Sequence, residues 1–124
     1  MKAGVDIVAV SRLRPLMPLP GDPFWRKIYS DREMQEAAER SSPLHYLAGR
    51  WAAKEAVMKT LPTLDHLPND PLRENQIEIL TEEDGRPYLL LRGERINISV
   101  SISHEEEYAI AFAVNCEEEK HDIH

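Results

Sequence analysis

The sequence of 124 residues is poor in the features that mark membrane, disulfide-stabilised or nucleic-acid-binding proteins. Its one cysteine, Cys116, allows no intramolecular disulfide, which fits a reducing cytoplasm. No apolar run approaches the roughly 18 residues of a membrane helix, and the first ten residues do not resemble a signal peptide. A net charge of −7 argues against nucleic acid or an anionic membrane as a partner. We therefore expect a soluble, cytoplasmic protein.

Two common chemical signatures are also missing. No glycine-rich phosphate loop is present, and the five histidines do not have the spacing of a zinc site. The composition, with 42% hydrophobic and 30% charged residues, is that of a globular domain. We expect one domain over residues 1–116, followed by an acidic, mobile tail over residues 117–124.

Hydrophobic patterning predicts five strands. Residues 4–10 are apolar on both faces, which predicts a central strand. Two hairpins are expected later in the chain, the first around the turn formed by Glu83, Asp84 and Gly85 and the second around His104 and Glu105. The hairpin strands are predicted at residues 76–80, 88–91, 97–103 and 108–114. In the last of these, one face is all alanine and should pack under a helix.

Two helices are predicted between the first strand and the hairpins. Ser30 and Glu33 form a capping-box pattern that begins a helix ending near residue 40. Ser42 and Pro43 predict a second helix over residues 42–61, with Ser42 as the N-cap. Prolines predict a loop before residue 30 and an irregular loop over residues 62–75. The expected fold class is α+β, with a largely antiparallel sheet packed against a long helix.

Glu55 is the most informative side chain of the second helix. At about 100° per residue from Leu47, Trp51 lies at about 40°, Glu55 at about 80° and Lys59 at about 120°. Glu55 therefore lies within the apolar stripe, where an unpaired carboxylate is costly. It must be protonated, paired or bound to a cation. The alternative is an ordinary ion pair with Lys59, four residues later.

Asp6 is a second carboxylate in an unusual place, because aspartate is rare inside strands. It could be an edge-facing or capping residue. If the strand packs against the second helix, however, Asp6 and Glu55 can meet between the two layers. Two carboxylates that share a site with phosphates and water are typical ligands of Mg²⁺.

Several cationic side chains could bind phosphate near such a site. Arg50, Lys54 and Lys59 share the helix with Glu55, although a solvated helix face would explain them equally well. His104 at a strand end could bind phosphate or transfer a proton, or could be an ordinary hydrogen-bonded residue.

Three stretches together resemble the short holo-acyl-carrier-protein synthases of the 4′-phosphopantetheinyl transferase superfamily. They are Gly4-Val5-Asp6-Ile7-Val8, Arg50-Trp51-Ala52-Ala53-Lys54-Glu55-Ala56 with Lys59, and Ser101-Ile102-Ser103-His104. Asp84-Gly85-Arg86-Pro87-Tyr88 also resembles a hairpin of that family. The resemblance extends from about residue 3 to residue 114, and it implies the 4′-phosphopantetheinyl transferase fold.

The resemblance implies an enzyme that moves 4′-phosphopantetheine from coenzyme A to a serine of an acidic apo acyl carrier protein. Mg²⁺ would be the cofactor, coenzyme A the co-substrate and adenosine 3′,5′-bisphosphate the product. The short members form homotrimers with active sites between subunits. The implied roles are as follows: Asp6 and Glu55 as metal ligands; Arg50, Lys54, Lys59, Gly85, Pro87 and His104 at coenzyme A; Glu55, Lys59, His104 and Glu105 in catalysis; and Arg12 and Arg26, extended by Lys27, at the carrier protein.

The sequence departs from the family at three points. The loop after Lys59 lacks the glycines common there, Trp51 replaces a phenylalanine, and Glu105 follows His104 where the family varies. Residue chemistry alone leaves other functions open. A different metal-dependent phosphate or nucleotide enzyme, and a non-catalytic carrier-protein-binding module, both fit an acidic α+β domain.

Overall fold

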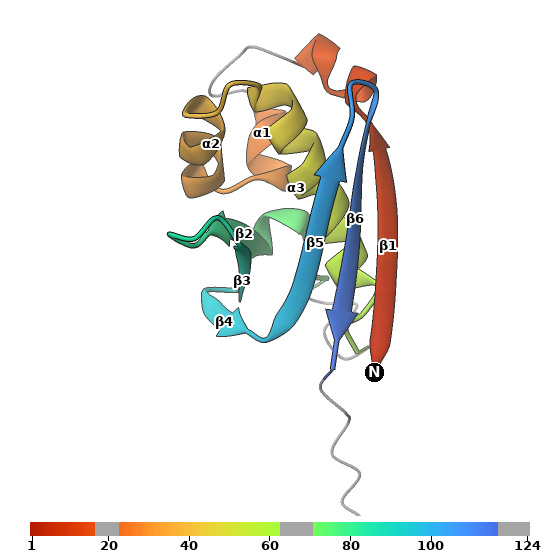
Figure 1. Ribbon diagram of the computed structural model, residues 1–124. Coiled ribbons are helices and arrows are strands. Elements are labelled where there is room, and N and C mark those ends of the chain that lie inside the picture. The colour runs from red at the N-terminus through yellow and green to blue at the C-terminus, as the bar shows by residue number, and fades with distance from the viewer. Residues whose placement is uncertain (17–22, 63–70, 117–124) are drawn as a thin grey trace, which may run out of the picture.

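The computed structural model describes residues 1–16, 23–62 and 71–116, and its elements confirm the α+β class (Figure 1). The strands are β1 (Lys2–Ala9), β2 (Ile77–Thr81), β3 (Pro87–Leu91), β4 (Glu94–Ile96), β5 (Ile98–His104) and β6 (Tyr108–Asn115). The helices are α1 (Pro23–Ile28), α2 (Asp31–Ala38) and α3 (Pro43–Met58). The 3₁₀ turns η1 (Val10–Arg12) and η2 (Arg14–Leu16) follow β1, and η4 (Glu74–Gln76) precedes β2.

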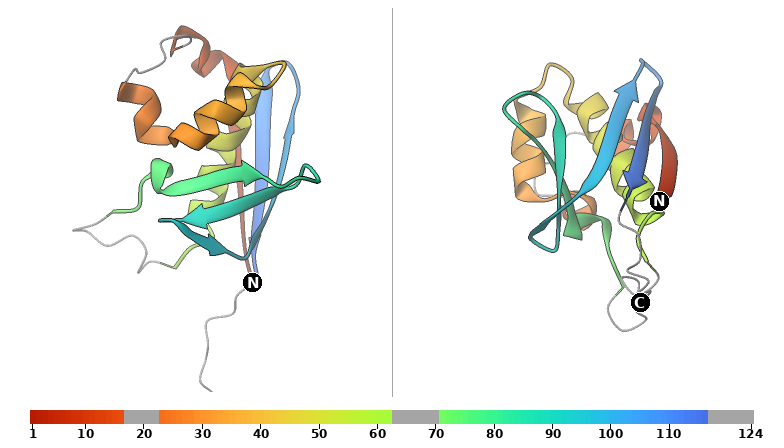
Figure 2. Two further views of the ribbon diagram at one scale, coloured as in Figure 1. Left: turned by 90° about the vertical axis from the view of Figure 1, so that its left-hand side faces the viewer. Right: turned by 60° about the horizontal axis from the view of Figure 1, so that its bottom comes forward.

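The strands form two antiparallel sheets, with the orders β1-β6-β5 and β2-β3-β4. Helix α3 runs behind the long sheet, and the small sheet lies beside β5 (Figures 1 and 2). The prediction that residues 4–10 form a central strand is wrong, because β1 lies at an edge of its sheet. One face of β1 packs on α3 through Val8, whereas Val5 and Ile7 on the other face are exposed.

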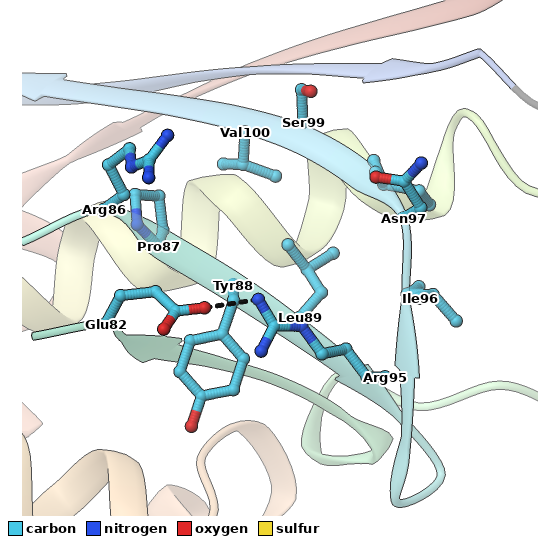
Figure 3. A pocket seen from close by; sticks show the side chains of 11 residues that line it. Glu82, Arg86, Pro87, Tyr88, Leu89, Arg95, Ile96, Asn97, Ser99 and Val100 are labelled. Carbon is cyan, nitrogen blue, oxygen red and sulfur yellow. Dashed lines mark hydrogen bonds and ion pairs between the residues drawn. The ribbon is translucent and has the colours of Figure 1, made fainter. Parts of the chain in front are cut away.

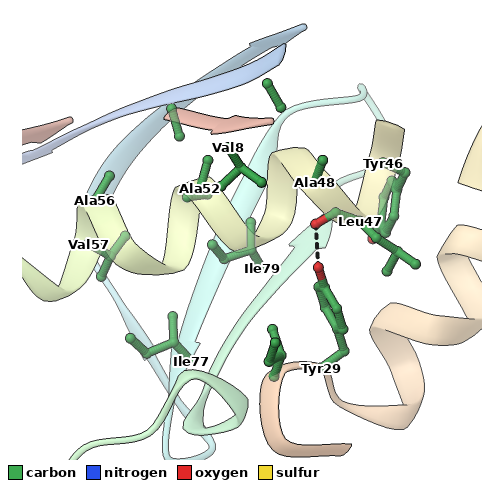
Figure 4. Packing of buried hydrophobic residues seen from close by; sticks show 14 of the residues in the cluster. Val8, Tyr29, Tyr46, Leu47, Ala48, Ala52, Ala56, Val57, Ile77 and Ile79 are labelled. Atoms are coloured by element: carbon green, nitrogen blue, oxygen red, sulfur yellow. Dashed lines mark hydrogen bonds between the residues drawn. The ribbon is translucent and has the colours of Figure 1, made fainter. Parts of the chain in front are cut away.

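Small residues let the long sheet approach α3 closely. Ala109, Ala111 and Ala113 of β6 are buried, which confirms that the alanine face packs under a helix. A Cβ atom built on Gly4 would lie 2.1 Å from the carbonyl oxygen of Ala56, so only glycine fits there. Figure 4 shows the resulting core, in which α3 is surrounded by side chains of β1, β2 and the segment at Tyr29.

Both predicted hairpins are confirmed, and the structure adds a strand. The turn between β2 and β3 contains Gly85 at φ +92°, a conformation that glycine adopts without strain. Strand β4 was not predicted. It follows a tight turn in which Arg92 and Gly93 both have positive φ, the geometry that suits a two-residue hairpin loop.

The helix predictions are correct in place and differ in their ends. The capping box of Ser30 and Glu33 is present at the start of α2. Helix α3 begins at Pro43, but Ser42 makes no side-chain cap and its hydroxyl bonds to His45 instead. The last helical residue is Met58 rather than residue 61, because the amide groups of Thr60 and Leu61 turn back to carbonyls three residues earlier.

The proline-rich segment before residue 30 contains α1, which was predicted as loop. Pro23 begins the helix, a position where its missing N–H is harmless. Trp25 and Ile28 are buried, so packing supports this short helix. Most of the predicted loop 62–75 and the predicted tail 117–124 lie outside the described residues.

Candidate functional site

Asp6 and Glu55 come together between β1 and α3, as the sequence predicts. Asp6 lies on the same face of β1 as Gly4 and Val8, the face that packs on α3. It is half-buried, and its carboxyl is close enough to that of Glu55 to affect its ionisation. The close approach allowed by Gly4 is what brings the strand and the helix to this distance.

Glu55 is surrounded by groups that disfavour its charged form. Burial raises the pKa of the Glu55 carboxyl above its ordinary value, and the nearby acids Glu74 and Asp6 raise it further. Trp51 opposes this shift through a hydrogen bond to the carboxyl. A cation would stabilise the half-buried carboxylates of Asp6, Glu55 and Glu74. Glu74 was not predicted from the sequence.

Lys59 supplies part of the positive charge at this site. Its Nζ donates to the carbonyl of Val5 at 2.8 Å and lies 3.4 Å from Oδ1 of Asp6. The alternative prediction of a Glu55–Lys59 ion pair is therefore wrong for the described residues, since the ion pair of Lys59 is with Asp6. The Lys59 side chain is 54% exposed, so its ammonium group is accessible to a bound anion.

The donor set fits a hard divalent cation that is shared with a substrate. Asp6 and Glu55 offer carboxylate oxygens, which Mg²⁺ prefers, and they lie where a positive charge would relieve their repulsion. Across the described segments, no group of three or more His, Cys, Asp or Glu side chains is arranged to hold a metal alone. The remaining ligands would then come from phosphate oxygens and water, as is usual for Mg²⁺.

Arg12 and Arg26 border this region on the outside of the molecule. The guanidinium of Arg12 lies 5.0 Å from the ring centroid of Trp51, which in turn reaches Glu55. Phe24 packs edge-on against Trp51 at 6.1 Å. Arg26 and Lys27 are exposed on α1, so the three cations lie at the surface where a partner could meet them.

A second group of predicted residues lies at the other end of α3. A groove there is lined by residues of α3, of the β2–β3 hairpin and of β5. They include Arg40, Ser42, His45, Tyr46, Gly49, Arg50, Thr81, Gly85, Ile102 and His104. We call this the His104 groove. It gathers Arg50, Gly85 and His104, three of the residues predicted at coenzyme A.

His104 is held against α3 by another histidine. The His45 and His104 rings are 5.2 Å apart, and Nδ1 of His45 lies 2.5 Å from the Ser42 hydroxyl. Nε2 of His45 lies 3.0 Å from the carbonyl of Glu106 in the β5–β6 turn. A carbonyl only accepts, so Nε2 donates this bond. Glu105, beside His104 in that turn, is exposed.

The two groups are separated within one chain. Asp6 lies opposite Ala111, Ala111 lies opposite Ile102, and His104 is two residues further along β5. With strands about 4.8 Å apart and a rise of about 3.4 Å per residue, the Cα atoms of Asp6 and His104 are about 12 Å apart. The structure thus brings together Asp6, Glu55 and Lys59, but not His104 with them.

A third groove, of about 560 Å³, lies between the small sheet and β5 (Figure 3). It includes Pro87, which was predicted at coenzyme A, and Arg86. Arg95 pairs with Glu82 beside it and covers the ring of Tyr88. Pro87 and Gly85 therefore face different grooves on the two sides of the same hairpin.

The outer edge of β2, on the side away from β3, is bonded to side chains of α2 and α3. Glu33 accepts from the amide of Ile79 at 2.8 Å, and Glu36 accepts from the amide of Thr81 at 3.2 Å. Arg50 donates to the carbonyl of Ile79 at 3.1 Å and to the Thr81 hydroxyl at 2.8 Å. The guanidinium of Arg50, predicted to clamp phosphate, is thus also engaged in holding β2.

Lys54 is placed differently from its predicted role at coenzyme A. Its side chain is fully buried, and Nζ contacts Glu33 at 2.7 Å, the carbonyl of Glu74 at 3.1 Å and the carbonyl of Ile77. These three contacts use all three ammonium donors, leaving none for a phosphate. Helical periodicity could have indicated this, because Lys54 lies only about 20° from Leu47 on the helix.

Three comparisons relate the chain to known proteins. Residues 2–113 match the 4′-phosphopantetheinyl transferase superfamily. A holo-[acyl-carrier-protein] synthase of Thermodesulfovibrio yellowstonii is 37% identical over 111 residues, which cover 90% of this chain and 94% of the relative. The structure of an ACPS–CoA complex from Chronobacterium ammoniagenes has a TM-score of 0.70 and 32% identity, covering 90% of this chain and 92% of that one.

A holo-(acyl-carrier-protein) synthase from Bacillus anthracis, solved in complex with CoA (3′,5′-ADP), is similar at a TM-score of 0.68 and 27% identity. It covers 90% of this chain and 91% of that one. None of the helices described is long and apolar enough to cross a membrane.

Proposed function

The chain belongs to the 4′-phosphopantetheinyl transferase superfamily, and on this premise we propose that it acts as a holo-[acyl-carrier-protein] synthase. It would transfer the 4′-phosphopantetheine group from coenzyme A to a serine of an apo acyl carrier protein. The observation that carries the proposal is the meeting of Asp6 and Glu55 beside Lys59, in a chain whose similar structures include complexes with coenzyme A.

The reaction exchanges one ester bond to phosphorus for another. The serine hydroxyl of the carrier protein attacks the β-phosphorus of coenzyme A and loses its proton. The bond from that phosphorus to the bridging oxygen breaks, and adenosine 3′,5′-bisphosphate leaves with the bonding electrons. Such transfers depend mainly on positioning and on stabilising negative charge, which suits a site of few side chains.

The side chains at the site have separate tasks in this proposal. Asp6 and Glu55 would hold Mg²⁺, which when bound neutralises charge that develops on the phosphate oxygens. Lys59, exposed beside Asp6, would contact the same oxygens. The serine proton would pass to Glu55, to Glu105 or to a bound water, and these three acceptors remain alternatives.

The groove residues would bind the nucleotide end of coenzyme A. Arg50, Gly85 and His104 lie together in the His104 groove, and Pro87 lies on the other side of the same hairpin. His104 could donate to a phosphate oxygen or transfer a proton there. Arg12 and Arg26, with Lys27, would attract the acidic carrier protein from the surface beside Trp51.

We further propose a homotrimer with each active site between two subunits. Exposed apolar side chains form one face of the β1-β6-β5 sheet, on the side away from α3. They are Val5, Ile7, Tyr108, Ile110 and Phe112, each between 44% and 58% exposed. An apolar face of this kind is typical of a surface that another chain covers. The separation of Asp6 from His104 supports the same arrangement, because a second copy could bring its His104 groove to the carboxylates.

A cytoplasmic location is part of the proposal. Cys116 is an exposed free thiol, and a reducing compartment would keep it so.

Mass spectrometry of apo acyl carrier protein after incubation with the protein, coenzyme A and Mg²⁺ tests the proposed reaction. The expected result is a mass increase of one phosphopantetheine group, together with release of adenosine 3′,5′-bisphosphate. Omission of Mg²⁺ with a chelator should abolish both. An unmodified carrier protein across several candidates would contradict the proposal, and nucleotide hydrolysis without any carrier would favour a different phosphate enzyme.

A further inference from the structure

A fully buried ion pair lies next to Glu55 on α3 and takes no part in the reaction proposed above. Lys54 and Glu33 have no exposed side-chain surface, and their charged atoms are 2.7 Å apart. Oε1 of Glu33 also accepts from the amide of Ser30 at 2.9 Å, and Oε2 accepts from the amide of Ile79 at 2.8 Å. The pair therefore joins the start of α2, the middle of α3 and strand β2.

Stability is a weak explanation for such a pair. Removing two charges from water is expensive, and apolar residues of similar volume are often at least as stabilising. The pair instead fixes the relative orientation of the elements it joins, because an ammonium group with three acceptors has only one arrangement that satisfies all of them. Lys54 meets this condition with Glu33, the carbonyl of Glu74 and the carbonyl of Ile77.

Two contacts connect the pair to the carboxylates. Lys54 precedes Glu55 on α3, so the anchoring of one side chain limits the rotation of the helix that carries the other. The η4 turn that Lys54 holds through a carbonyl also carries the Glu74 side chain, whose carboxyl lies close enough to Glu55 to raise its pKa. Lys54 therefore links the helix that carries Glu55 to the turn that carries Glu74.

We propose that Lys54, paired with Glu33, is a positioning residue that fixes α3 against η4 and so orients Glu55 toward the cation site. The inference rests on the proposed function for its meaning, although it concerns cation binding rather than the transfer step. It also replaces the expected contact between Lys54 and coenzyme A with an indirect role.

The test compares cation affinity with stability in Lys54→Met. In the transfer assay, the Mg²⁺ concentration that gives half the maximal rate should rise by about tenfold or more, since loss of a residue that orients metal ligands typically weakens metal affinity by about 10–100-fold. The rate at saturating Mg²⁺ should stay within about threefold of the wild type, because no reacting group is lost. Mn²⁺ affinity in the presence of coenzyme A, measured by electron paramagnetic resonance without turnover, should fall by a similar factor.

Leu47→Ala is the matched control. Leu47 is 1% exposed on the same helix, two turns before Glu55, and its truncation lowers the melting temperature by creating a cavity. The half-saturating Mg²⁺ concentration should nevertheless remain within about twofold of the wild type. Glu33→Gln is a milder second variant that keeps an acceptor for Lys54 and removes the charge, and it should shift the Mg²⁺ requirement in the same direction by about threefold.

Several results would overturn the inference. A lower melting temperature with an unchanged Mg²⁺ requirement in Lys54→Met or Glu33→Gln would show a structural role alone. A loss in maximal rate that saturating Mg²⁺ does not restore would instead indicate a direct contact with substrate. If Lys54→Met does not fold, the Mg²⁺ requirement and the Mn²⁺ affinity of Glu33→Gln decide the question. A wild-type protein that binds Mn²⁺ with coenzyme A but modifies no carrier would contradict the proposed function and leave the positioning test valid.

Discussion

The two ends of α3 differ in how their polar side chains are satisfied. At the C-terminal end, Glu55 lies close to Asp6 and Glu74, and the mutual repulsion of these acids is only partly offset by Lys59. At the N-terminal end, the polar groups bond to one another. Ser42 bonds to His45, and Arg50 stacks 4.3 Å from the centroid of the Tyr46 ring while it donates to β2.

The difference separates a region that needs a ligand from one that is already organised. Carboxylates that repel each other favour a cation, because a bound cation relieves a repulsion that is already present in the folded protein. A network whose members bond to one another instead gives a rigid wall against which a ligand can be placed without reorganisation. We infer that the first region performs the chemistry and the second positions the nucleotide.

Removal of a carboxylate should have the largest effect. Asp6→Ala should lower the transfer rate by about 10³-fold, because loss of a cation ligand removes several kcal/mol of charge stabilisation. The rate is followed by the mass increase of the carrier protein. Glu94→Ala, which removes an exposed carboxylate from β4, is the control and should leave the rate unchanged. Equal rates for the two variants would remove the distinction between the ends of α3.

Mixing two inactive variants should show whether the ends act across subunits. Asp6→Ala and His104→Ala chains, unfolded together in equal amounts and refolded, should regain about a quarter of the wild-type rate. This follows because random assembly gives one site in four both intact halves. Each variant refolded alone should stay inactive. If the mixture is no more active than its components, the complete site lies within one chain.

Gly4→Ala should test the packing that creates the carboxylate end. The added methyl group would lie 2.1 Å from the carbonyl oxygen of Ala56, so β1 must move away from α3. We expect a loss of about 3 kcal/mol in the free energy of unfolding, measured by urea denaturation. Ala3→Val adds more volume at an exposed neighbouring position and should change stability by less than about 0.5 kcal/mol. Similar losses for both would show that the close approach is unimportant.

A smaller effect is expected from acid titration of Glu36, which lies near the N-terminal end of α3. Burial alone would raise the pKa of Glu36, but hydrogen bonds from Tyr46 and Thr81 lower it below the ordinary value of 4.5. A depressed carboxyl pKa contributes stability above pH 4.5, and this contribution is lost as pH falls through the folded pKa. Glu36→Gln should therefore reduce the steepness with which the melting temperature falls below pH 4.5. An unchanged acid profile would show that Glu36 is not stabilised by these bonds.

Periodicity was a good guide where one residue broke a regular pattern. Glu55 stood out because a carboxylate in an apolar stripe has few explanations, and the alternating hairpin strands were equally clear. The same angles place Lys54 about 20° from Leu47, at the border of the stripe. Its partner Glu33 comes from another helix, so local patterning could not reveal the pair. The capping-box pattern explained Glu33 only in part, since its side chain also reaches β2.

Tertiary relations account for what the sequence alone did not predict. Glu74 follows a proline-rich segment without periodicity, so no local pattern could place it beside Glu55. The apolar residues on both faces of β1 indicated burial on both sides, but within one chain only one side is covered. Short elements such as α1 and β4 are held by packing and turn geometry rather than by propensity, which is why α1 was predicted as a proline-rich loop and β4 was not predicted.

The side chains that bond to the outer edge of β2 have a consequence for how the chain folds. An unpaired strand edge is a template for pairing with another molecule, and here that edge is closed only after α2 and α3 have docked. A folding intermediate with a formed hairpin but undocked helices would present the open edge. Variants that delay docking should therefore aggregate during refolding, even at concentrations where the native protein stays dispersed.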